Sequence, residues 1–241
     1  MLDTTKAIPT NYFDLVNSYL GWGDPYNGIW FIGLEEAIGW EEHTEQEILN
    51  DYDGSPYNTV GDTERDWKKL GNTGKAIRDY TSKIVYKFSA LAKNEHLSWS
   101  DYRDKILWGK DSQVFQANLF PLGKPTTREW PQHFKKLFGF GPEERNDYVE
   151  HTKKTRFVKI KKLWEQCSVK ATICFGKEGW ENFNSLFGTE NAEKDEIISS
   201  KIYANDDKKI IFTPFFANGH MSNEKVDKIV ERLNSWNVHI N

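Results

Sequence analysis

The chain has 241 residues, of which 38% are hydrophobic and 15% aromatic, and its formal net charge is −4. A chain of this length buries a substantial core, and its aromatic content argues against disorder. No run approaches the roughly 20 apolar residues that a membrane span needs. The N-terminus lacks the basic and apolar regions of an export signal. We therefore expect a cytoplasmic protein that has no membrane partner.

The two cysteines, Cys167 and Cys174, are too few for a disulfide framework or a four-cysteine metal cluster. We expect both to be buried, reduced thiols. The negative net charge argues against a dedicated nucleic-acid binder. Charge is segregated along the chain, however: the basic segment, residues 151–162, holds six Lys or Arg and no acid, whereas residues 35–53 hold eight acids and no Lys or Arg.

Four short apolar runs predict strands, at residues 28–34, 112–120, 170–175 and 209–215. Each run is nearly continuous in apolar or β-branched residues, which is typical of strands that are covered on both faces. Segments with helical spacing alternate with them. These helical segments lie within residues 62–94, 157–164 and 226–233, and Asn223 is a candidate cap for the last one.

This alternation predicts an α/β protein, a three-layer α/β/α sandwich around a four-stranded parallel sheet. Residues 1–241 contain no repeat or linker, so we expect a single domain with a large insert between the first and second strands.

Ligands of open parallel sheets bind outside the carboxyl ends of the strands, so the residues at those ends matter most. Glu35 follows the first predicted strand, Asn118 lies at the end of the second, and His220 follows the fourth, just before the last helix. An acid, an amide and an imidazole at one edge of the sheet predict a shared site.

The order of these residues resembles the motifs of the uracil-DNA glycosylase superfamily. Residues 33–35 (GLE) resemble the first motif, which places the attacking water, and residues 54–57 (GSPY) resemble the segment whose aromatic ring stacks on the extruded base. Residues 118–122 (NLFPL) resemble the stretch whose asparagine reads the base. Residues 172–176 (TICFG) resemble the third strand, and residues 220–222 (HMS) the motif whose histidine stabilises the departing base.

The resemblance implies a monofunctional DNA glycosylase that acts on a flipped uracil-like, damaged or modified base. It implies that Glu35 and His220 are catalytic and that Asn118 and Tyr57 bind the base. DNA is the expected partner of a monomeric protein that needs no cofactor and no metal cluster.

The phosphate contacts are expected from two places. Ser222 would bind a flanking phosphate, assisted by the N-terminus of the last helix. From the basic segment, Lys153, Lys154 and Arg156 would hold more distant phosphates.

Two positions depart from the superfamily pattern. Glu36-Ala37 stands where the first motif continues with proline, and Met221 replaces the proline of the last motif. Both changes affect loops that pinch the DNA backbone in that superfamily, so they bear on substrate geometry and on specificity for plain uracil. The acidic segment at residues 35–53 and the negative net charge leave two other functions open. One is a glycosylase-like fold that binds without catalysis, and the other is a hydrolase of small nucleosides or nucleotides.

Overall fold

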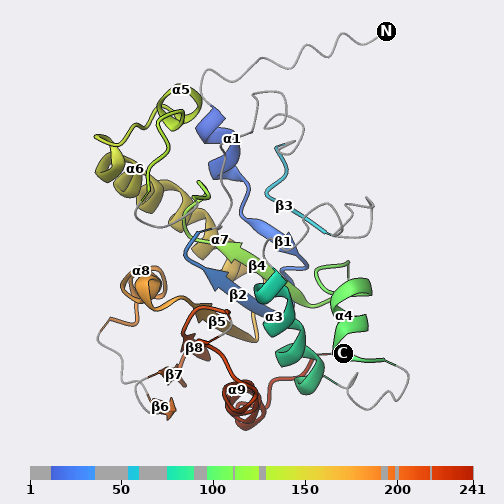
Figure 1. Ribbon diagram of the computed structural model, residues 1–241. Helices are drawn as coiled ribbons and strands as arrows, with labels where there is room; N and C mark the ends of the chain where they lie inside the picture. The colour runs from blue at the N-terminus through green and yellow to red at the C-terminus, as the bar shows by residue number, and fades with distance from the viewer. Residues whose placement is uncertain are drawn as a thin grey trace, which may run out of the picture.

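The computed structural model describes residues 12–35, 54–59, 75–89, 97–110, 112–124, 129–190, 195–198, 201–217 and 219–240. Its strands are β1 (Gly21–Gly23), β2 (Ile29–Gly33), β3 (Tyr57–Asn58), β4 (Val114–Asn118), β5 (Ala171–Phe175), β6 (Asp195–Ile198), β7 (Ile202–Asn205) and β8 (Ile210–Thr213). Its helices are α1 (Tyr12–Ser18), α3 (Lys75–Phe88), α4 (Trp99–Lys105), α5 (Phe134–Phe138), α6 (Arg145–Thr152), α7 (Val158–Gln166), α8 (Trp180–Phe187) and α9 (Asn223–Ser235) (Figure 1). A π-helical turn, η2 (Lys153–Phe157), joins α6 to α7, and a 3-10 turn, η3 (Lys177–Gly179), precedes α8.

The described strands form one mixed sheet of eight strands in the order β3-β1-β4-β2-β5-β8-β7-β6. Its central strands β4, β2, β5 and β8 are parallel neighbours and correspond to the four predicted runs. The α/β class is therefore confirmed, but the prediction of a four-stranded, wholly parallel sheet was wrong. β1 runs antiparallel to β4, and β7 and β6 extend the other side as antiparallel strands. The added strands have two to four residues, too few for a clear apolar run.

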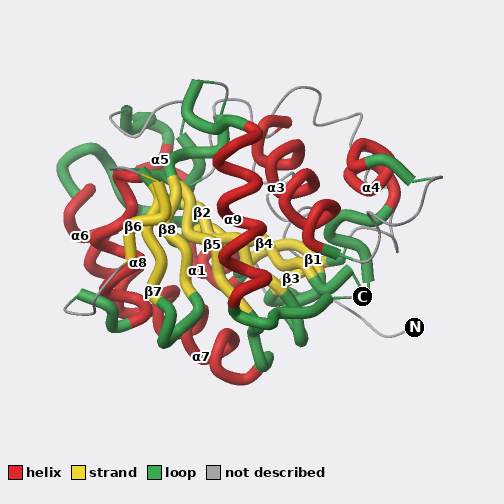
Figure 2. The backbone as a smooth tube through the Cα atoms, turned by 90° about the horizontal axis from the view of Figure 1, so that it is seen from below, coloured by secondary structure: helices red, strands yellow, loops and turns green. Residues whose placement is uncertain are grey.

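Helices cover both faces of the sheet (Figure 2). α1, α5, α6, α7 and α8 contribute to one hydrophobic cluster, and α3, α4 and α9 contribute to the other. The described helices between β2 and β4, α3 and α4, belong to one face, whereas α8, between β5 and β8, belongs to the other. This divergence creates a topological switch point between the carboxyl ends of β2 and β5, where α/β proteins bind ligands.

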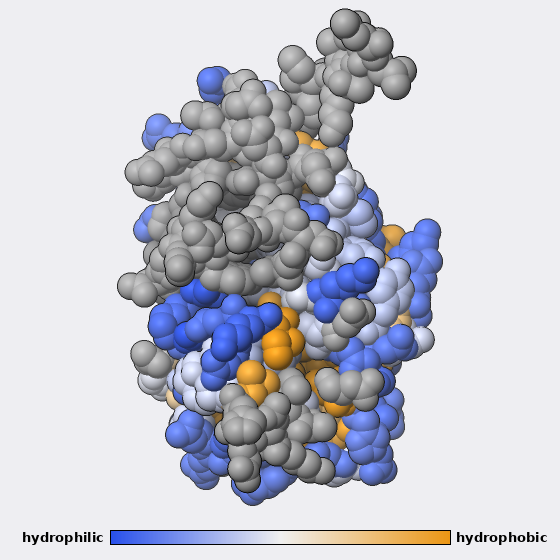
Figure 3. Space-filling model, turned by 90° about the vertical axis from the view of Figure 1, so that its right-hand side faces the viewer, coloured by the Kyte–Doolittle hydropathy of each residue, from blue (hydrophilic) through white to orange (hydrophobic). Residues whose placement is uncertain are grey.

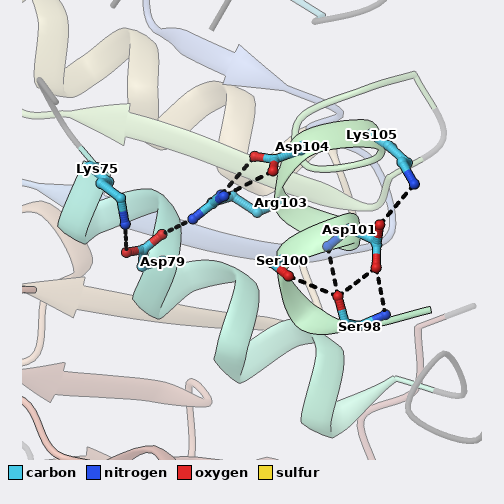
Figure 4. A network of polar contacts seen from close by, with 8 residues as sticks. All are labelled: Lys75, Asp79, Ser98, Ser100, Asp101, Arg103, Asp104 and Lys105. Atoms are coloured by element: carbon cyan, nitrogen blue, oxygen red, sulfur yellow. Dashed lines mark hydrogen bonds and ion pairs between the residues drawn. The ribbon is translucent and has the colours of Figure 1, made fainter. Parts of the chain in front are cut away.

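Ion pairs join α3 to α4 (Figure 4). Arg103 donates to Asp79 at 2.6 Å and to Asp104 at 2.7 Å. A capping box, in which Ser98 and Asp101 satisfy each other's backbone amides, begins α4. These contacts fix the α3–α4 pair as a unit beside the sheet.

α3 in turn supports the loop that precedes α9. The Tyr80 hydroxyl donates to the Met221 carbonyl over 3.2 Å, and the Tyr80 ring packs against Phe216 with 6.0 Å between centroids. The loop that carries His220 therefore rests on α3.

The face of the molecule on the right-hand side of Figure 1 is mostly hydrophilic where it is described, with a smaller hydrophobic area (Figure 3). Among the described helices, none is both long and apolar enough to cross a membrane.

Candidate functional site

Glu35 and Asn118 emerge from neighbouring parallel strands. Gly33, the last residue of β2, is the register partner of Asn118 in β4. The pairing continues past the strand ends, because Leu119 donates its amide to the Gly33 carbonyl and Phe120 donates to that of Leu34, at 3.0 and 2.8 Å. The two predicted site residues thus leave the sheet from the same edge.

Gly33 is a glycine because its neighbours leave no space for a side chain. A Cβ atom at this position would lie 2.5 Å from Asn118 Oδ1 and 2.8 Å from Cζ of Phe175. The Asn118 amide oxygen and the Phe175 ring therefore both lie beside the end of β2. The space that Gly33 leaves open is where these two side chains lie.

Glu35 forms an ion pair that the sequence did not predict. Lys124 Nζ lies 2.7 Å from Glu35 Oε2, and their side chains are only 5% and 9% exposed respectively. The Lys124 ammonium also lies 5.3 Å from the centroid of the Trp130 ring. The pair links the loop after β2 to the loop after β4.

Burial raises the pKa of Glu35 above its ordinary value of 4.5, while the positive charges of Lys124 and Arg145 act in the opposite direction. The carboxylate in turn adds to burial in raising the pKa of the Tyr148 hydroxyl, which accepts a hydrogen bond from the Leu122 amide at 3.3 Å. A carboxylate with a raised pKa is a stronger base toward a bound water at neutral pH.

His220 lies in an exposed turn between β8 and α9. Its amide donates to the Ala217 carbonyl over 3.1 Å, and its carbonyl accepts from Lys225 Nζ. Phe216 anchors this turn, since its ring stacks on Phe175 with 4.7 Å between centroids and 14° between planes. The turn therefore lies at the same edge as Glu35, but no contact between described residues joins the His220 ring to Glu35 or Asn118.

Ser222 is the N-cap of α9, not Asn223 as predicted. Its hydroxyl accepts the Lys225 amide at 3.3 Å, and the side chain is exposed. Ser222 thus has a structural role, and it still lies at the N-terminus of a helix.

Tyr57 pairs with Gly21, which also pairs with Ala117, but the contacts of its side chain lie away from the predicted site. Its hydroxyl bonds to Tyr26, which precedes β2 and so lies at the opposite end of the parallel strands from Glu35. Burial and this hydrogen bond raise the pKa of Tyr57 to about 12. The ring packs edge-on against Phe115, so the described contacts of Tyr57 are with the core, and its base-stacking role stays a prediction.

The basic segment divides into exposed and buried parts. Lys154 is exposed, and Lys153 is partly exposed with its ammonium 3.5 Å from a Glu150 carboxylate oxygen. Arg156 is only 3% exposed, and its guanidinium donates to main-chain carbonyls, including that of Asn118 at 2.9 Å. Arg156 cannot reach a phosphate outside the protein, so that part of the prediction is wrong.

A small pocket adjoins Asn118. Tyr19, Trp22, Phe120 and Arg156 are among its lining residues. Neither Glu35 nor His220 lines this pocket, so the structure brings the three predicted site residues to one edge but not into this one cavity.

Two residues of this edge were missed from the sequence. Lys124 is the partner of Glu35, and its position six residues after Asn118, in the loop that follows β4, was the available signal. Phe215 follows β8, is half-buried, and packs 6.1 Å from the Phe175 centroid. It is an aromatic residue at the correct end of the sheet.

Cys167 and Cys174 are free and buried, as predicted. Across the described part of the chain, no three His, Cys, Asp or Glu residues converge to hold a metal ion. No protein-family model matches the chain, and no curated protein matches it either.

Replacing Lys124 by Met should destabilise the protein by about 3–5 kcal/mol at neutral pH, because it leaves a buried carboxylate unpaired. The loss of stability should be smaller at acid pH. Without Lys124 the folded-state pKa of Glu35 rises further, so the carboxyl is protonated and uncharged at low pH. The free energy of unfolding then falls as the pH rises through that raised pKa. Urea unfolding from pH 4 to pH 8 measures this. Lys124→Met with Glu35→Gln should recover stability. Lys110→Met, at an exposed position before β4, is the control, and an equal loss in both lysine variants would refute a buried pair.

Ser222→Ala should lower stability by about 1 kcal/mol, while Ser222→Asp should keep the cap, since aspartate caps helices as well as serine. If a phosphate binds here, Ser222→Asp should still weaken binding to a single-stranded oligonucleotide. Ser235→Ala, at the other end of α9, provides the comparison. Unchanged oligonucleotide affinity in Ser222→Asp would place the phosphates elsewhere.

Proposed function

We propose that this protein is a DNA glycosylase that hydrolyses the N-glycosidic bond of a flipped, uracil-like, damaged or modified base. It acts as a cytoplasmic monomer without a cofactor, on a fold in which the parallel strands β4, β2, β5 and β8 form the uracil-glycosylase-like sandwich. The observation that carries the proposal is the buried Glu35 carboxylate at the switch point of the sheet, one strand away from Asn118.

Glu35 fits the chemistry of this reaction. As the glycosidic bond breaks, the sugar becomes cationic, and a carboxylate in a poorly hydrated site stabilises that charge strongly. The raised pKa of Glu35 also favours removal of a proton from the attacking water. Lys124 keeps the carboxylate ionised despite its burial.

Asn118 and His220 act on the base in this proposal. A side-chain amide offers both a donor and an acceptor, so Asn118 can read the edge of a base. The exposed imidazole of His220 donates to the base oxygen as negative charge builds there. Removing one such donor typically lowers the rate by about 10²–10³-fold.

Phe215 takes the stacking role that the sequence assigned to Tyr57. It is half-buried, and it lies beside Phe175, whose ring lies next to Gly33 at the end of β2. Stacking of a base on an aromatic ring contributes about 1–3 kcal/mol. Lys153, Lys154 and Ser222 remain the proposed phosphate contacts.

A binding protein without catalysis is the second candidate, because the net charge of −4 disfavours tight DNA binding. A hydrolase of small nucleosides is the third candidate, since catalysis by the buried Glu35 carboxylate does not require a DNA-binding surface.

Incubation with oligonucleotides that each carry one damaged or modified base, followed by alkaline strand breakage, separates the three candidates. A glycosylase creates breaks, a binding protein only retards the oligonucleotide, and a nucleoside hydrolase releases base from free nucleosides alone.

Glu35→Gln should lower the single-turnover excision rate by at least about 10²-fold, because the charge opposite the cationic sugar is lost while the volume is kept. Oligonucleotide affinity should change little. In the unsubstituted protein, kcat/KM should rise with pH through a midpoint above 4.5, since only the carboxylate form is active. Glu165→Gln, on the exposed face of α7, is the matched control. Excision at the normal rate by Glu35→Gln would remove Glu35 from the mechanism.

Phe215→Leu should reduce kcat/KM for excision about tenfold, because it removes the stacking platform. Tyr57→Leu should lower thermal stability and leave kcat/KM of the folded protein nearly unchanged, because the Tyr57 ring packs against Phe115. Both are measured on one oligonucleotide substrate. The reverse pattern would return the stacking role to Tyr57.

A further inference from the structure

The π-helical turn η2 brings Arg156 into the protein interior. α6, η2 and α7 run on from one another, and the wider turn lies between them. Turns of this kind are rare and often mark functional sites. The Thr155 hydroxyl donates to the His151 carbonyl at 2.8 Å and accepts from Asn17 Nδ2 at 2.9 Å, which ties the turn to α1.

The Arg156 guanidinium bonds to two segments of the chain. Its Nε donates to the Asn118 carbonyl over 2.9 Å. Its Nη1 donates to the carbonyls of Asn17 and Tyr19, and Nη2 to that of Leu20 at 3.3 Å. One planar group therefore connects the end of β4 to the link between α1 and β1.

The sheet itself leaves a place for this arginine. β1 pairs with β4 only up to Ala117, the partner of Gly21, and so stops one residue short of Asn118. On its other side, β4 pairs with β2 through Gly33 and Asn118. Arg156 supplies a donor for the Asn118 carbonyl where the neighbouring strand ends.

We infer that Arg156 is a positioning residue for Asn118, and that the η2 turn serves base discrimination rather than DNA affinity. This inference rests on the proposed function. The guanidinium holds the main chain at Asn118, while Gly33, which has no side chain, lies beside its amide oxygen on the neighbouring strand. With the main chain held, the amide presents its donor and acceptor in one orientation to a base.

A lysine at position 156 tests this role. Its single ammonium keeps the charge but cannot donate to both segments with the fixed fork of a guanidinium. Arg156→Lys should therefore lower kcat/KM for the preferred base at least tenfold relative to a base that differs at one edge group. Binding of an abasic oligonucleotide should change less than twofold, because the phosphate contacts remain.

The measurement is the ratio of single-turnover kcat/KM values for two oligonucleotides. One carries the base that is excised most rapidly in the panel. The other carries an analogue of that base, in which an amino group replaces a carbonyl or a carbonyl replaces an amino group. Arg103→Lys is the matched control, because Arg103 also makes several hydrogen bonds, but to Asp79 and Asp104 on the α3–α4 pair. It should leave the ratio unchanged.

A uniform loss for both bases would show that Arg156 is only structural and would overturn the inference while leaving the glycosylase standing. No excision of any base by the unsubstituted protein would overturn both. If Arg156→Lys does not fold, Thr155→Val keeps the guanidinium and loosens η2. It should lower the same ratio by a smaller factor, and an unchanged ratio would equally refute the inference.

Discussion

The ion pair between Glu35 and Lys124 is the constraint on which the site depends. A carboxylate and an ammonium with 9% and 5% of their side chains exposed are each stable only while the other is present. Their contact holds the loop after β2 against the loop after β4. The burial of the pair also sets the basicity of Glu35 at this edge of the sheet. The same burial that makes the carboxylate depend on Lys124 raises the pKa of Glu35.

Packing at the strand ends extends this constraint across the sheet. Gly33 leaves space for Asn118 and Phe175, Phe175 stacks on Phe216, and Phe216 precedes the turn that carries His220. These neighbours place the loops after β2, β4 and β8 at one edge of the sheet, although the pocket beside Asn118 includes only one of the three predicted residues.

The sequence predicted the four central strands because each is a nearly continuous apolar run that is buried in the sheet. It could not predict β1, a Gly-Trp-Gly segment, since three residues carry no period. The location of Glu35, Asn118 and His220 at one edge followed from the parallel sheet alone. The sequence did not show in which direction the Tyr57 ring points, because a two-residue strand can place an aromatic ring toward either end of the sheet.

Charge was the least predictable property. Arg156 and Lys154 belong to one basic segment, yet the η2 turn buries the first and leaves the second exposed. Lys124 stands in a loop where exposure is the ordinary expectation for lysine, and only the tertiary structure brings Glu35 to it. Local sequence shows which residues are charged, whereas the folded chain decides which of those charges meet.

The ionisation of Glu35 tests the account most directly. Its side-chain carboxyl carbon can be followed by NMR from pH 3 to pH 9 in protein labelled with carbon-13, and assigned through Glu35→Gln. We expect a midpoint above 4.5, which moves further up when Lys124 is replaced by Met. A midpoint at or below 4.5 that does not respond to the loss of Lys124 would show a solvated carboxylate and would contradict the buried pair.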